Sequence, residues 1–140
     1  MKFILFILLL PAFSLCQDPP KKTNTIKVTG VDFKTAATLL LDQGYMIEKS
    51  DTSLGFMMSA PKMVHKAWSG NLKINVRMKD STAIITGLYN MNVNLSTVDL
   101  KQYEPVENIG MKGSVIRTAF EALDKYAKSF GRPVEYLVIK

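Results

Sequence analysis

Eight residues of strict alternation constrain the fold of this chain more than any other feature of its sequence. From Leu72 to Lys79 every second residue is apolar, and the residues between them are polar. A period of two places the apolar side chains on one face of a β-strand. Asp80 and Ser81 form a tight turn into a second strand-like run at residues 82–89, so the two runs predict a hairpin. The sheet is expected to have one dry face and one wet face.

Two amphipathic helices are predicted, one on each side of this hairpin in the chain. Asp32 can cap the first helix, and apolar residues then recur at helical spacing until Gly44 ends it. Ser114 can cap the second, longer helix, whose apolar stripe continues to Phe130. Each helix therefore has one apolar face that must be buried against another element.

The remaining strand-like runs complete an α+β pattern. They cover residues 25–29, 45–49 and 56–59, and residues 134–139 are compatible with a last edge strand. The predicted order is β-α-β-β-β-β-α, with four to six antiparallel strands and both helices on the dry face, a helix-grip or TBP-like arrangement. Residues 90–113 have no clear pattern and are longer than most loops.

The first sixteen residues predict a cleaved signal peptide. Lys2 precedes an unbroken apolar run, Phe3–Leu10, which at about 1.5 Å per residue spans only ~12 Å of a ~30 Å hydrocarbon core. We expect cleavage after Cys16, and the alternative is a lipid anchor on Cys16 itself. The mature chain is thus expected in the periplasm or outside the cell, with no transmembrane span.

Residues 17–24, with two prolines and two lysines, predict a disordered lead-in to a single domain at residues 25–140. Cys16 is the only cysteine, so the domain can form no internal disulfide, thiol nucleophile or zinc knuckle. The formal net charge of +6 favours anionic partners. The sequence lacks the dense runs of basic residues expected of a nucleic-acid-binding protein.

A set of turn and packing residues follows the first helix: Gly44, Tyr45, Ile47, Asp51, Gly55 and Phe56. This set resembles the repeated unit of helix-grip domains in envelope lipoproteins, such as the accessory lipoprotein of outer-membrane barrel assembly. Residues 111–114, Met-Lys-Gly-Ser, are similar to a stretch that opens the last helix of small exported Bacteroidetes proteins. The resemblance implies a fold and an envelope location, and it brings no catalytic residue.

The best candidate surface is the wet face of the alternating strand. Lys73, Arg77 and Lys79 share that face, and Trp68 is a large aromatic residue in an irregular segment close by in sequence. Exposed aromatic residues among cations bind anionic polymers and lipid headgroups. We therefore expect a non-enzymatic binding module for an anionic surface or an envelope protein. The plain alternative is an ordinary solvated sheet face.

A copper site is the rival hypothesis. Met57, Met63 and His65 lie close in sequence, and thioether and imidazole groups are ligands for Cu(I). Methionine more often fills gaps in cores, which is the competing interpretation.

Hydrolysis by loop carboxylates is a third hypothesis. Asp99, Glu104 and Glu107 lie in the long irregular segment, with Tyr103 able to stack on a sugar. The single histidine, His65, has no partner in sequence that resembles a nucleophile or an orienting acid. The sequence predicts no cofactor.

Overall fold

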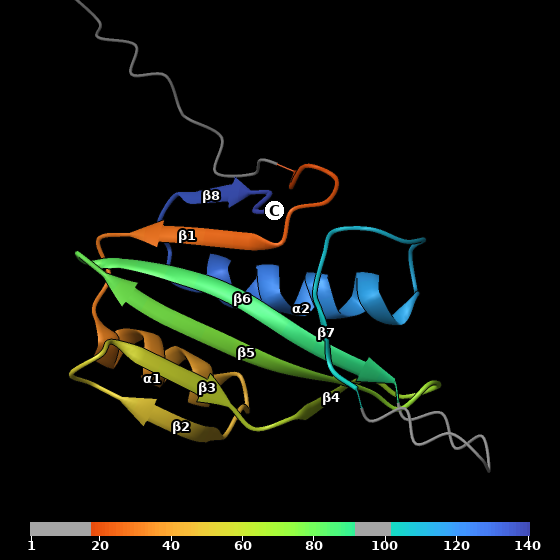
Figure 1. Ribbon diagram of the computed structural model, residues 1–140, viewed down its shortest axis with the longest axis horizontal. Coiled ribbons are helices and arrows are strands. Elements are labelled where there is room, and N and C mark those ends of the chain that lie inside the picture. The colour runs from red at the N-terminus through yellow and green to blue at the C-terminus, as the bar shows by residue number, and fades with distance from the viewer. Residues whose placement is uncertain (1–17, 92–101) are drawn as a thin grey trace, which may run out of the picture.

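The computed structural model describes residues 18–91 and 102–140 and has an α+β fold with an antiparallel sheet (Figure 1). The elements, in chain order, are β1 (Thr25–Thr29), α1 (Phe33–Asp42), β2 (Ile47–Asp51), β3 (Phe56–Ser59), β4 (Lys62–His65), β5 (Gly70–Lys79), β6 (Thr82–Met91), β7 (Glu104–Pro105), α2 (Val115–Lys128) and β8 (Val134–Leu137). The predicted class is confirmed.

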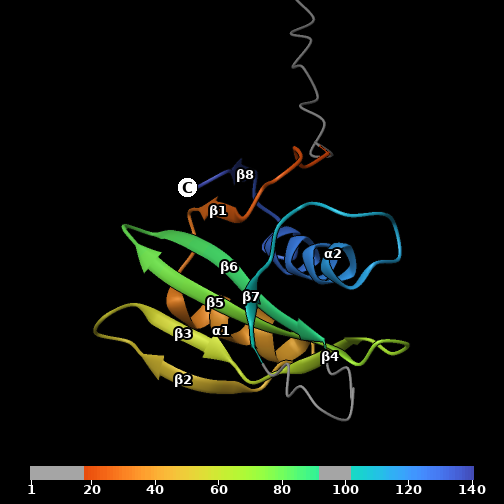
Figure 2. The ribbon, with the colours of Figure 1, turned by 45° about the vertical axis from the view of Figure 1, so that its right-hand side comes forward.

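The sheet has more strands than the sequence predicted. Its main path runs β2-β3-β5-β6-β1-β8, with β4 paired to β5 and β7 paired to β6, which gives eight strands among the described residues. The added strands are β4 and β7, both short. Helix α2 packs against the sheet beside β6 and β1, as Figure 2 shows.

The central hairpin forms as predicted. Strands β5 and β6 pair along their whole length, from Gly70↔Met91 to Lys79↔Thr82. Asp80 and Ser81 between them have φ values of 50° and 59°. Two successive residues with positive φ match the right-handed twist of the flanking strands, and aspartate tolerates that conformation better than most residues.

The dry face of the sheet and the helices share one apolar core. Leu72, Ile74 and Val76 on β5 are fully buried together with Phe120 and Leu123 on α2. Burial of each such side chain stabilises the fold by roughly 1.5–3 kcal/mol. Both helices contribute to this core, and both lie behind the sheet in Figure 1.

Both predicted helix caps are present. The Asp32 carboxylate accepts a hydrogen bond from the Thr35 backbone N–H at 2.6 Å, and this bonding lowers the pKa of Asp32 below its usual value. Ser114 Oγ accepts from the Arg117 backbone N–H at 3.3 Å. Gly44, directly after α1, has a φ of 79°, the left-handed conformation that ends helices.

Strands β3 and β4 pair one after the other with the same edge of β5. The β3 partners are residues 75–77 of β5, and the β4 partners are residues 70–72. At the junction, Ser59 Oγ accepts the buried backbone N–H of Ile74 at 2.9 Å. The stretch after Pro61, expected to be irregular, therefore contains a strand and a hairpin turn.

The lead-in differs from the prediction of disorder. The Asn108 side-chain amide donates to the carbonyls of Pro19 and Pro20, each at 2.8 Å. Thr23 is fully buried, and the Asn24 backbone N–H donates to Leu137 O at 3.0 Å. These hydrogen bonds hold residues 19–24 against the domain, because a proline-rich segment keeps carbonyl acceptors even where it lacks N–H donors.

Some expectations fall outside the described residues. The signal peptide at residues 1–16, with Cys16, and the loop acid Asp99 are among them. Within residues 18–91 and 102–140, neither helix has the length and apolar character needed to cross a bilayer.

Candidate functional site

The outer face is the side of the sheet that points away from the helices. It is formed by Phe56 and Met58 of β3, the odd-numbered residues of β5, and the even-numbered residues of β6. The sequence predicted a charged, wet surface here. The structure adds apolar side chains, because β6 places Ile84 and Leu88 on this face, where they are partly exposed.

Arg77 and Asn75 lie at the centre of the outer face. In the strand register Arg77 stands between Phe56 of β3 and Ile84 of β6, while Asn75 pairs with Thr86 of β6. Directly opposed residues have Cβ atoms about 4.5–5.5 Å apart, so Arg77 is flanked by an apolar neighbour on each side. Arg77 and Asn75 are separated by about 7 Å along the same strand.

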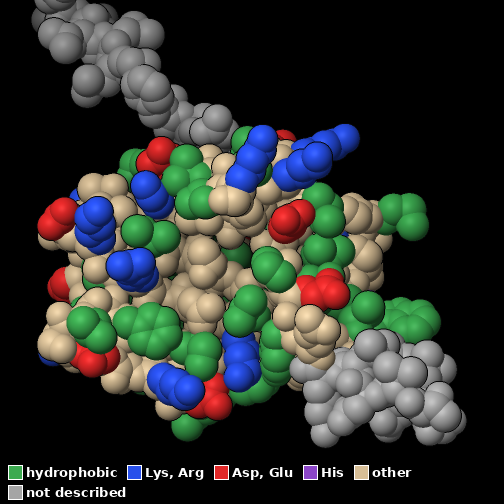
Figure 3. All heavy atoms as spheres, in the orientation of Figure 1, with side chains coloured by type: hydrophobic (Ala, Val, Ile, Leu, Met, Phe, Trp, Pro, Cys, Tyr) green, Lys and Arg blue, Asp and Glu red, His purple; other side chains and the backbone are tan. Residues whose placement is uncertain are grey.

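This part of the outer face is hollowed. A depression of about 560 Å³ is lined by the groove residues Leu54, Phe56, Asn75, Val76, Arg77, Ile84 and Thr86. Leu54 stands at its side with 73% of its surface exposed. In Figure 3, which shows this face, Lys and Arg side chains lie beside apolar ones.

Asn75 supplies an unused acceptor to the groove. Its Oδ1 atom is buried and has no hydrogen-bond partner among the residues that the structure describes. A buried acceptor without a donor costs free energy, so the great majority of buried polar atoms are paired. The groove thus combines apolar walls and an exposed cation, with a buried, unpaired acceptor beside them.

The three predicted cations are not equivalent. Lys73 is partly buried, forms an ion pair with Glu48 at 3.2 Å, and its ammonium lies 4.9 Å from the centre of the Tyr103 ring. Arg77 is exposed and lines the groove, whereas Lys79 is exposed at the end of β5 beside the turn. Arg77 is therefore the cation placed to meet a ligand in the groove.

Trp68 is not part of this face. It lies in the turn between β4 and β5, before Gly70, and Arg77 is seven residues further along β5. At about 3.3 Å per residue that is roughly 23 Å along the strand. The structure thus separates the predicted aromatic residue from Arg77, the cation of the groove.

The three candidate copper ligands are not brought together. Met57 is fully buried and pairs with Val76, while Met63 is exposed and pairs with Asn71. These β5 positions are five residues apart, about 16 Å along the strand, and an odd separation places them on opposite faces. Met57 is a core residue, as the packing interpretation expected.

His65 is engaged by the backbone at both ring nitrogens. Its Nε2 lies 2.8 Å from Gly113 O, and the Trp68 backbone N–H donates to Nδ1 at 3.4 Å. A carbonyl can only accept, so Nε2 is the donor in the hydrogen bond to Gly113 O. His65 thus links the β4–β5 turn to the loop before α2.

Glu104 and Glu107 are the candidate loop carboxylates that the structure describes. Glu104 accepts a hydrogen bond from the Tyr89 hydroxyl at 3.1 Å. Burial, followed by this bond, raises the pKa of Tyr89. Within the described parts of the chain, no three His, Cys, Asp or Glu side chains lie close enough to hold a metal ion.

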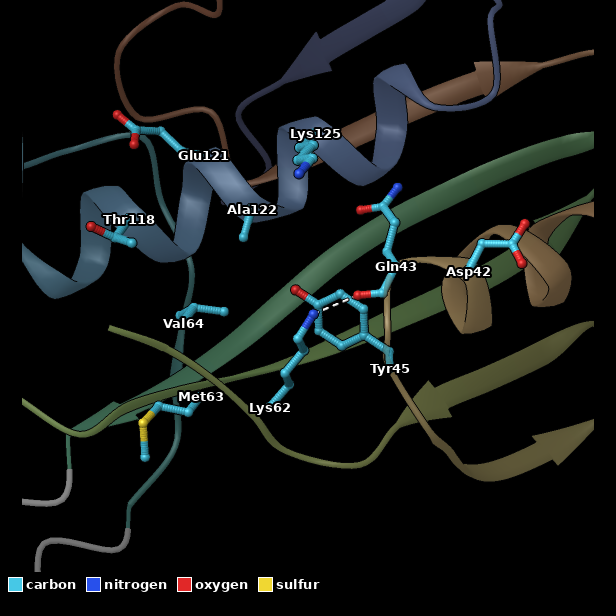
Figure 4. A pocket seen from close by; sticks show the side chains of 10 residues that line it. All are labelled: Asp42, Gln43, Tyr45, Lys62, Met63, Val64, Thr118, Glu121, Ala122 and Lys125. Atoms are coloured by element: carbon cyan, nitrogen blue, oxygen red, sulfur yellow. Dashed lines mark hydrogen bonds between the residues drawn. The ribbon is translucent and has the colours of Figure 1, made fainter. Parts of the chain in front are cut away.

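A second hollow lies between α2, β4 and the end of α1. It measures about 590 Å³, and Figure 4 shows the side chains around it. Lys62 donates to the backbone carbonyl of Gln43, and its ammonium lies 4.6 Å from the centre of the Tyr45 ring. The charged residues that line this hollow carry both signs and are Asp42, Glu121, Lys62 and Lys125. Balanced charges select neither anions nor cations, so the groove on the outer face is the better candidate.

No protein-family model matches the chain, and no curated protein shows significant similarity to it. The site must therefore be argued from its own geometry.

Sequence reasoning found Arg77 and missed the rest of the groove. One signal was present: residues 82–89 carry apolar side chains in both phases, with Ile84 and Leu88 alternating with Ala83 and Ile85. A strand that is apolar in both phases indicates burial or contact on both faces. Asn75 gave no such signal, because its environment depends on neighbouring strands.

Proposed function

We propose that this protein is a non-catalytic binding module that holds an acidic segment of a partner protein on the outer face of its sheet. The observation that carries the proposal is the groove, in which the exposed Leu54 and the partly exposed Phe56 and Ile84 lie around Arg77 and Asn75. Protein interfaces combine an apolar centre with a polar rim and are enriched in arginine. The groove contains both apolar side chains and an arginine, although here the arginine lies at the centre.

Each groove residue has a distinct role in this proposal. The Arg77 guanidinium forms paired hydrogen bonds with a carboxylate of the partner, a geometry that its planar fork favours. Asn75 Oδ1, which is buried in the unbound protein, accepts a backbone N–H of the bound segment once the side chains that cover it move aside. Phe56, Ile84 and Leu54 cover an apolar side chain next to that carboxylate. The positive net charge of the chain speeds the approach of an acidic partner.

Two variants matched in charge test the role of Arg77. The probe is a fluorescein-labelled peptide of alternating Glu and Leu, followed by fluorescence anisotropy, with an alternating Lys and Leu peptide as the negative control. Arg77→Glu should raise the Kd at least about tenfold, because a hydrogen bond to a charged group contributes about 1.5–3 kcal/mol. Lys79→Glu changes the net charge equally outside the groove and should raise the Kd less than about threefold. Equal losses for the two variants would mean general charge attraction, and the proposed site would be wrong.

Asn75→Leu separates binding from folding. Leucine has a similar size and removes the buried acceptor, so the free energy of unfolding should stay the same or rise. Binding of the acidic peptide should nevertheless weaken, since the peptide N–H loses its acceptor. A variant that binds the peptide as tightly as the unaltered protein would contradict the role given to Asn75.

The same proposal places the module in the cell envelope with a helix-grip arrangement. Its support is the apolar leader at residues 1–16 and the likeness of residues 44–56 to envelope lipoprotein domains. The intact mass of the protein isolated from its host tests the location. A chain that begins at Gln17 indicates cleavage, and added lipid mass at Cys16 indicates an anchor. A full-length chain would contradict export through a cleaved leader.

A further inference from the structure

One end of the molecule exposes several large apolar side chains. Trp68, in the β4–β5 turn, is 59% exposed, and Met111, in the loop before α2, is 83% exposed. Met63 on β4 is 54% exposed. Figures 1 and 2 both show this turn and this loop at the same end of the molecule. We call residues 62–71 and 109–114 the hairpin end.

The two segments of the hairpin end are fixed to each other. The hydrogen bond from His65 to the Gly113 carbonyl joins the turn to the loop. Behind them, β5 and α2 approach so closely that a Cβ atom on Gly70 would lie 2.6 Å from Val115 Cγ1. Trp68 and Met111 are therefore presented by one rigid platform, which lowers the entropy cost of inserting both side chains into a partner at once.

The charge of the hairpin end is entirely positive. Residues 62–71 and 109–114 contain Lys62, Lys66 and Lys112 and no aspartate or glutamate. Lys62 is directed to the end of α1, where it donates to Gln43 O, whereas the exposed Lys66 and Lys112 lie two residues before Trp68 and directly after Met111 in the chain. Protruding apolar side chains surrounded by lysines are complementary to a membrane surface that contains anionic lipids.

We propose that the hairpin end docks on an anionic membrane surface. Trp68 and Met111 enter the boundary between headgroups and acyl chains, where the amphipathic indole ring is favoured. Lys66 and Lys112 meet the lipid phosphates. This contact uses a different surface from the groove and does not rest on the proposed peptide binding. An acidic protein surface is the competing occupant, and the experiment distinguishes the two.

Trp68 is the single tryptophan of the chain, so its fluorescence reports the hairpin end alone. The full chain is titrated with vesicles of phosphatidylcholine containing 30% phosphatidylglycerol, and with pure phosphatidylcholine as the control. We expect a blue shift of the Trp68 emission and quenching by brominated acyl chains with the anionic vesicles. A double variant, Lys66→Glu with Lys112→Glu, keeps Trp68 and should weaken the partition at least about tenfold. The matched control, Lys27→Glu with Lys79→Glu, makes the same charge change on the sheet. Its partition into vesicles should stay within about threefold of that of the unaltered protein.

Every outcome decides the proposal. Sedimentation with vesicles without a shift of the Trp68 emission would show that another segment binds the lipid, and would overturn it. Equal loss in the two double variants would reduce the effect to net charge and overturn it as well. A blue shift that appears with an acidic protein and not with vesicles would assign the hairpin end to a protein partner. Met111→Gln gives an independent check, since it should weaken partition without changing the net charge.

Discussion

Ser59 joins the sheet at the point where β5 changes partner. Pairing of β3 with β5 runs to Met58↔Asn75, and pairing of β4 with β5 begins at Leu72. The Ile74 backbone N–H lies between these ladders, and Ser59 Oγ accepts it at 2.9 Å. Both residues are fully buried. Ser59→Ala therefore leaves a buried N–H without its acceptor.

The loss in free energy of unfolding depends on whether a substitution leaves a buried polar group unpaired. An orphaned buried donor costs about 1–3 kcal/mol, which is the expected loss in unfolding free energy for Ser59→Ala. Tyr126→Phe also removes one buried hydrogen bond, the one from the hydroxyl to Ala36 O at 2.8 Å. That carbonyl lies inside α1 and keeps its helical N–H donor, so nothing is orphaned. The expected cost is about 0.5–1.5 kcal/mol.

Urea unfolding followed by circular dichroism measures both losses. Ser59→Ala should lower the midpoint more than Tyr126→Phe does, with an unchanged slope. Ser50→Ala, on the exposed strand β2, is the control for the serine-to-alanine change and should stay within about 0.5 kcal/mol. The reasoning is refuted if Tyr126→Phe costs as much as Ser59→Ala, or if Ser59→Ala behaves like the control.

Two further predictions concern a cap and a buried hydroxyl. Ser114→Ala removes the acceptor at the start of α2 and should lower the free energy of unfolding by about 1 kcal/mol, measured by thermal unfolding. Ser114→Asp supplies another acceptor and should keep the stability of the unaltered protein. Equal losses for the two variants would show that the cap is unimportant. Burial raises the pKa of Tyr45 to about 12. Folding thus favours the neutral form of Tyr45. Its contribution to the free energy of unfolding is complete below pH 10 and falls by about 1.4 kcal/mol per pH unit from there towards pH 12. Tyr45→Phe should flatten this alkaline loss in urea unfolding at graded pH, and an unchanged slope would exclude Tyr45 as its source.

The sequence predicted those parts of the fold that depend on neighbours in the chain. The β5–β6 hairpin and the caps at Asp32 and Ser114 follow from alternation, a turn dipeptide and a side-chain acceptor, all of which act within a few residues. Their energetics are local, so a single sequence carries them. The final strand, β8, also forms where an edge strand was considered.

The added strands depend on contacts that the sequence does not show locally. β4 exists because β5 is ten residues long and β3 pairs with only part of its edge, which leaves hydrogen-bonding groups for a second strand. β7 has two residues, and only its pairing with β6 defines it. The order in the lead-in likewise comes from Asn108, which is distant in sequence from Pro19.

The candidate site was predicted only in part for the same reason. The alternating pattern placed Lys73, Arg77 and Lys79 on one face, but the Glu48 partner of Lys73 is 25 residues away in sequence. The groove around Asn75 needs β3, β5 and β6 together. Charge could be assigned to a face from the sequence, whereas shape and pairing required the assembled sheet.

The two ends of the sheet have a consequence for self-association. β2 and β8 are the two ends of the main strand path, and neither has a second strand neighbour among the residues that the structure describes. A copy adding itself there would have to strip water from Glu48 and Lys49 at one end, or from Glu135 at the other. Replacing Glu48 and Lys49 with threonine would remove that barrier. The exposed edge strand would then favour strand addition by further copies and the growth of fibrils.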